Sequence, residues 1–124
     1  MTYCTTTELQ RLTGSELAEE VLEGIIDQAD REIKAAIYQA GLVPPAANDA
    51  LKAASLNLSI IGTYTRQRMD GTHPSTLTVG DKSVSDDIDA AIEGLRAKAS
   101  ALVAAYIANP TAITSSLRLY KVND

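Results

Sequence analysis

Apolar residues recur along most of the chain at the three- and four-residue steps of an amphipathic α-helix. The steps are clearest over residues 17–37 and 88–106. A third stretch with the same steps covers residues 47–65 and should end near Met69. The pattern predicts three long helices, each of which turns one apolar stripe toward a shared core.

Capping signals predict a short helix ahead of these three. Thr5 and Glu8 have the spacing of a capping box, in which a hydroxyl and a carboxylate satisfy the first free amides of a helix. The short helix should cover about residues 6–12 and end at Gly14, because glycine readily adopts the left-handed backbone of a helix end.

The second helix should begin directly after a cap at Thr13 or Ser15 and end at Gly41. Pro45 is expected at or just before the first turn of the third helix, where a missing amide costs nothing. Because only a few residues connect the two helices, they should lie nearly antiparallel.

The apolar period changes from helical to alternating before residue 85 and predicts a short β-hairpin over about residues 76–84. So small a hairpin needs support from helices or from another chain. The segment 111–124 has no partner strand nearby and should be an extended tail. We expect both to contact other subunits, through Leu77, Val79, Gly80, Asp81 and Lys82 in the hairpin and Leu117, Leu119, Tyr120 and Val122 in the tail.

The predicted fold class is therefore mainly α, in a single domain over residues 1–124. It consists of three long helices and a short N-terminal helix, with the hairpin between the last two long helices and the tail at the end. Composition agrees, since 45% of residues are hydrophobic and the chain has no Trp and no Phe. Small aliphatic side chains of this kind suit closely packed helices.

Charge is unevenly distributed along the chain, whose formal net charge is -5. Acidic residues in the second helix step by four and three, which predicts one acidic stripe opposite the core: Glu16, Glu20, Glu23, Asp27 and Asp30. The other two long helices carry basic residues, namely Arg66, Arg68, Arg96 and Lys98. The stripe is either a solvated face or one half of an interface, in which the acids of one copy face the bases of the next in a ring.

Chemical motifs are sparse. The single cysteine, Cys4, excludes an intrachain disulfide and a thiolate zinc cluster, and favours a reducing environment. The single histidine, His73, could act as a base for Cys4, but nothing in the sequence brings the two together. The seven glycines are dispersed and form no phosphate-binding loop. We expect no catalytic site, metal, cofactor or membrane span.

Three segments give the chain a resemblance to a known family. YCTTTELQRLTG at residues 3–14 and IIDQADREI at residues 25–33 resemble the N-terminal signature of head-to-tail connector proteins of tailed bacteriophages. LTVGDKSVS at residues 77–85, directly before a helix, is similar to the hairpin that many of these proteins carry.

The resemblance implies a structural, non-enzymatic subunit of a homo-oligomeric ring, typically dodecameric in this family. Such a ring attaches below the portal protein, prolongs the DNA channel, and provides the platform for a stopper or tail-completion protein. Phage DNA would be a partner only in transit through the lumen. The implied location is the head–tail junction of the virion, and the bacterial cytoplasm during assembly.

Two other interpretations stay open beside a small enzyme. A helical DNA-binding regulator would use the third helix for recognition, with Asn57, Arg66, Gln67 and Arg68, although net acidity opposes binding to phosphates. A helical adaptor of some other complex would share the fold without the ring.

Overall fold

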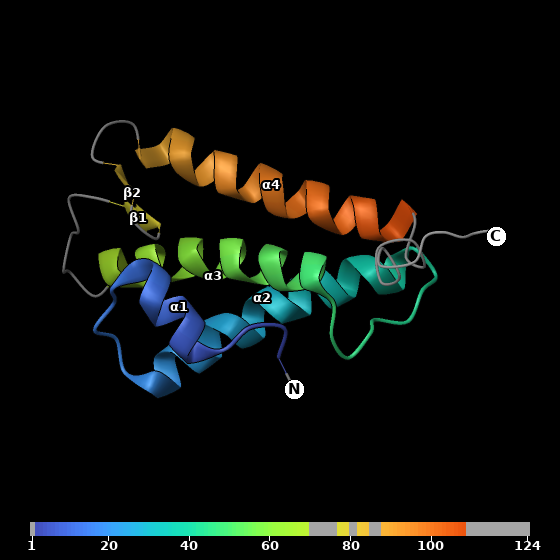
Figure 1. Ribbon diagram of the computed structural model, residues 1–124, viewed down its shortest axis with the longest axis horizontal. Coiled ribbons are helices and arrows are strands. Elements are labelled where there is room, and N and C mark those ends of the chain that lie inside the picture. Colours follow the sequence, from blue (N-terminus) through green and yellow to red (C-terminus); the bar gives the residue numbers. More distant parts are fainter. Residues whose placement is uncertain (1, 70–76, 80–81, 85–87, 109–124) are drawn as a thin grey trace.

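The computed structural model describes residues 2–69, 77–79, 82–84 and 88–108 (Figure 1). Its elements are α1 (Thr6–Thr13), α2 (Glu19–Gln39), α3 (Asp49–Met69), β1 (Leu77–Val79), β2 (Lys82–Val84) and α4 (Ile88–Ala108). The prediction of a helical bundle with three long helices and one short N-terminal helix is confirmed. Among the described helices, none is both long and apolar enough to cross a membrane.

Helix α3 is the centre of the bundle. It packs against α1, α2 and α4, whereas α2 and α4 scarcely touch one another. In Figure 1, α4 lies along one side of α3, and α1 and α2 lie along the other. Neighbouring long helices run antiparallel. For α2 and α3, this is the arrangement that their short connection predicted, and the end of α2 lies near the start of α3.

Two apolar clusters form the core, one toward each end of α3. The buried members of the first are Tyr3, Ile33, Ile37, Leu51, Ala54, Ala99, Val103 and Tyr106. Those of the second are Cys4, Leu9, Leu22, Ile26, Ile60 and Tyr64. Because Tyr3 belongs to one cluster and Cys4 to the other, the N-terminal segment links the two halves of the core.

Helix α1 begins and ends as the sequence predicts. Thr5 Oγ1 accepts a hydrogen bond from the Glu8 amide at 3.1 Å, and Glu8 Oε1 accepts from the Thr5 amide at 2.9 Å. Gly14 ends the helix in the left-handed region, with φ of 65°. An ion pair between Glu8 and Lys52 then ties α1 to α3, and the Lys52 ammonium is the main group that lowers the pKa of Glu8.

The predicted start of α2 was wrong. The helix begins at Glu19, after Ala18, without a side-chain cap. Both hydroxyls that were expected to cap it have other partners. Thr13 Oγ1 donates to the Leu9 carbonyl at 2.9 Å, and Ser15 Oγ accepts from the Leu17 amide at 3.1 Å. These short-range bonds fold the connection between α1 and α2, so α2 begins later in the sequence than predicted.

Helix α3 also begins later than predicted, at Asp49 rather than around Pro45. Asn48 Oδ1 accepts from the Leu51 amide at 3.1 Å and satisfies one free donor of the first turn. Because Asn48 supplies this bond, the helix begins directly after it, and Pro45 lies in the connection between α2 and α3. In α4, the predicted stripe is buried at Ala99, Val103 and Tyr106.

Strands β1 and β2 pair antiparallel, with Leu77 opposite Val84 and Val79 opposite Lys82. Strand β1 lies next to α1. The turn predicted at Gly80 and Asp81 lies outside the described residues, as does the tail 111–124.

Candidate functional site

An open groove runs along α3 between α2 and α4. It consists of two hollows of about 580 and 340 Å³ that meet at Glu32, Leu58 and Arg96. The larger one is also lined by Glu20, Val21, Gly24, Ile25, Gln28, Ala29, Ile61, Gly62, Thr65, Arg66 and Met69. The smaller one continues along Ile33, Ala36, Ala99, Ser100, Val103, Ala104 and Ile107. Most of this surface is apolar.

Two glycines explain why the larger hollow exists. Gly62 allows α2 and α3 to approach so closely that an added Cβ would lie 2.8 Å from Ile25 Cγ2. Gly24, on the facing wall, has nothing within 4 Å of the position of an added Cβ. The first glycine sets the spacing of the two helices, and the second leaves the wall without a side chain.

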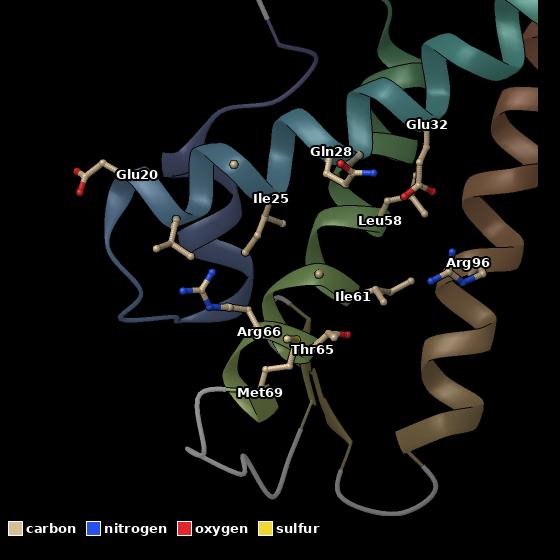
Figure 2. A pocket seen from close by; sticks show the side chains of 14 residues that line it. Glu20, Ile25, Gln28, Glu32, Leu58, Ile61, Thr65, Arg66, Met69 and Arg96 are labelled. Atoms are coloured by element: carbon tan, nitrogen blue, oxygen red, sulfur yellow. The ribbon is translucent and has the colours of Figure 1, made fainter.

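Charged side chains surround the apolar floor. Figure 2 shows Arg96 pointing from α4 toward Ile61, and Glu20 pointing away from the groove at the far end of α2. Glu32 and Arg66 complete the set of charged residues in the lining. Met69, at the end of α3, is 79% exposed. A large apolar surface with a charged rim is typical of an interaction site.

The four exposed members of the predicted acidic stripe lie in three separate places, and the fifth, Asp30, is buried. Glu16 is exposed but precedes α2. Glu20 belongs to the groove. Glu23 and Asp27 are exposed on another side of α2, where they line a hollow of about 320 Å³ with Thr2, Cys4, Thr5, Thr6 and Ile26. We call Glu23 and Asp27 the acidic edge.

The expectation that Asp30 joins an exposed interface was wrong, because Asp30 is only 4% exposed. Its Oδ2 accepts the Tyr3 amide at 3.0 Å, and its Oδ1 accepts the Ser55 hydroxyl at 2.7 Å. Since Ser55 gives its one proton to Asp30, the 3.3 Å contact between Cys4 Sγ and Ser55 Oγ uses the thiol as donor. This buried network fixes the N-terminal segment to α2 and α3.

The basic residues are divided as well. Arg66 and Arg96 line the groove. Arg68 lies elsewhere, with its guanidinium 5.7 Å from the centre of the Tyr64 ring. Lys98 is exposed on α4, outside the hollows that form the groove. Of the predicted interface residues, Glu20, Arg66 and Arg96 therefore line the groove, and Glu23 and Asp27 line a separate hollow.

Cys4 is 1% exposed, and this burial raises the pKa of its thiol. Such a thiol is a poor nucleophile at neutral pH. His73, the base that was weighed for Cys4 and not expected to pair with it, lies outside the described residues. Among the described residues, no group of three or more His, Cys, Asp or Glu side chains could hold a metal ion.

The contact residues predicted in the hairpin and the tail remain predictions. The backbone of Leu77, Val79 and Lys82 is described, but their side chains are not, and the tail residues fall in the segment 109–124.

Sequence reasoning missed the groove itself. Gly24 and Gly62 were the available sign of it, because each lies inside a helical pattern and does not end the helix. A glycine in such a position often has a role in packing or function. Asp30 also gave one. It follows Ile26 by four positions and precedes Ile33 by three, so it lies beside the apolar stripe.

Comparisons of the chain with models of protein families, with curated proteins and with solved structures found no match.

Proposed function

We propose that the chain is a structural subunit of a homo-oligomeric ring of the phage head-to-tail connector type. The observation that carries the proposal is the presence of two different surfaces on one small bundle. One is the acidic edge, and the other is the apolar groove with Arg66 and Arg96 at its rim. A head-to-tail ring requires two such unlike, complementary surfaces on every copy.

The order of elements supports the connector assignment. A capped short helix ends at Gly14, two long antiparallel helices follow, and a pair of strands precedes the last helix. This order agrees with the resemblance of residues 3–14, 25–33 and 77–85 to connector proteins. In this role the portal protein is the partner above the ring, a stopper or tail-completion protein is the partner below, and phage DNA passes through the lumen at the head–tail junction.

Sedimentation velocity and negative-stain electron microscopy of the full chain, at increasing concentration, test directly whether it forms a ring. We expect closed rings, with contacts between the acidic edge of one copy and the groove rim of the next. A chain that stays monomeric at high concentration, both alone and with a portal protein, contradicts the proposal.

Charge exchange sharpens this test. Reversal of the acidic edge by Glu23→Lys and Asp27→Lys should weaken assembly, and so should reversal of the rim by Arg66→Glu and Arg96→Glu. The chain that carries all four changes should assemble again, because opposite charges face one another once more. Circular dichroism of each variant controls for loss of helix. Equal assembly of all variants would remove the charged contact.

A DNA-binding regulator is the alternative that the same preparation can address. Helix α3, its candidate recognition helix, packs against three other helices, and much of its open face is the apolar floor of the groove. A recognition helix instead presents polar side chains to the major groove. A mobility shift at low salt, without rings in the microscope, would favour that alternative.

A further inference from the structure

The groove offers a long apolar surface that no described part of the chain covers. Its wall on α2 extends from Glu20 to Ala36, about 24 Å at the rise of an α-helix. Figure 2 shows Leu58 and Ile61 at its floor, with Arg96 on the facing helix. A long apolar strip of this kind suits an extended segment with alternating apolar side chains, which would lie on the floor between α2 and α4.

The sequence after α4 supplies a segment with this pattern. Leu117 and Leu119 are two positions apart, so both lie on one side of an extended chain, with Arg118 on the other. From Thr111 to Val122 such a chain reaches about 36 Å, which is longer than the groove wall. The segment is thus long enough to follow the whole groove.

Charge agrees with this occupant. The segment carries Arg118 and Lys121 and has no acidic residue before residue 124. The α2 side of the groove carries Glu20 and Glu32. Arg118, on the side of an extended segment opposite the leucines, would therefore meet Glu32 at the rim, while Leu117 and Leu119 occupy the apolar floor.

We infer that the groove between α2 and α4 binds residues 111–122 of a neighbouring copy of this chain. The inference rests on the proposed ring, in which each copy gives its segment to the next copy and receives one from the previous copy. Ile107, near the last turn of α4, itself lines the groove. A segment that entered its own groove would have to reverse direction directly after the end of α4, whereas entry into the groove of a neighbouring copy needs no such reversal.

Photo-cross-linking of the full chain tests the inference. Leu119 is replaced with p-benzoylphenylalanine, and copies labelled with nitrogen-15 are mixed with unlabelled copies before irradiation. Mass spectrometry should find cross-links between a labelled and an unlabelled copy, at residues of α2, α3 or α4 that line the groove. The same residue placed at Tyr120, on the opposite side of an extended segment, should cross-link there about tenfold less.

A matched pair of variants on α4 provides the control. Ala104 lines the groove and Ala105 does not, yet both are exposed. Ala104→Trp should fill the groove and lower the cross-link yield about tenfold, and Ala105→Trp should change it by less than about twofold. Cross-links confined to one copy, or cross-links only outside the groove, overturn the inference.

Failure of the inference can be told apart from failure of the proposed function. Rings that persist with Ala104→Trp and cross-link elsewhere contradict the groove as the binding site but leave the ring intact. Cross-links in the groove between two copies that sediment only as dimers support the groove contact and contradict the ring.

Discussion

The two sides of α3 differ in how they pack against the rest of the chain. On the side of α1 and α2, the N-terminal segment is fixed by buried polar bonds: Tyr3 and Ser55 both donate to Asp30, and Cys4 contacts Ser55. On the side of α4, the space between α2 and α4 stays open as an apolar groove. On the first, closed side, directional hydrogen bonds fix the position of each partner. On the second side, the surface is mostly apolar, and apolar contacts have no fixed direction. The difference indicates that the closed side holds the fold and that the open side is available for a partner.

The largest effect is expected where the closed side is broken. Asp30→Ala leaves the buried Tyr3 amide and the Ser55 hydroxyl without their acceptor, so the free energy of unfolding should fall by about 3 kcal/mol. Asp27→Ala, one turn away but exposed, should change it by less than about 0.5 kcal/mol. Urea unfolding measures both. Similar values for the two variants would mean that Asp30 does not hold the N-terminal segment in place.

The second-largest effect on stability is expected at one of the two glycines that line the groove and not at the other. Gly62→Ala places a methyl group 2.8 Å from Cγ2 of Ile25, a stiff β-branched side chain that cannot turn away cheaply. It should lower the stability by about 1–3 kcal/mol. Gly24→Ala meets no atom within 4 Å and should raise the stability by about 0.5–1 kcal/mol, because alanine favours the helix. Thermal unfolding compares them, and a stabilising Gly62→Ala would contradict the close approach of α2 and α3.

The smallest effect concerns pH on the closed side. Burial, and then the charge of Asp30, raise the pKa of Tyr3 to about 12. The folded chain therefore keeps a proton that the unfolded chain releases, so this contribution to stability is complete below pH 10 and is lost as pH rises from about 10 to 12.

Tyr3→Phe should flatten that alkaline loss. At neutral pH it should cost about 1 kcal/mol, because the 2.9 Å bond from the Tyr3 hydroxyl to the Pro45 carbonyl is removed. Tyr38→Phe, at a side chain that is 63% exposed, serves as the control and should leave the alkaline loss in place. Urea unfolding at pH 8 and pH 11 measures the loss of stability between the two pH values. An equal loss for Tyr3→Phe and the unaltered chain would argue against a buried Tyr3.

The sequence predicted the helices because their signals are local. The Thr5–Glu8 capping box, the left-handed Gly14 and the apolar steps of α2 each depend on residues within one or two turns. The predicted starts of α2 and α3 failed where more than one partner was available. Thr13 and Ser15 could cap a helix or shape a connection, and their choice of partner depends on how α1 meets α2.

The candidate site could be predicted only in fragments. Glu20, Arg66 and Arg96 were identified as charged contact residues, but the sequence did not indicate that they share one groove. Asp30 was grouped with exposed acids because it fits their four- and three-residue steps. Its burial depends on Tyr3 and Ser55, which lie 27 and 25 residues away in the chain.

The sequence by itself determined which segments are helical, which residues lie on their apolar faces, and where the charges fall, because periodicity and capping act over a few residues. Only the tertiary structure decided that α2 and α4 stand apart on α3, that Gly62 brings Ile25 close, and that Asp30 is buried beneath the N-terminal segment. These features depend on the distance and rotation between helices, which side chains far apart in the chain set jointly when they pack.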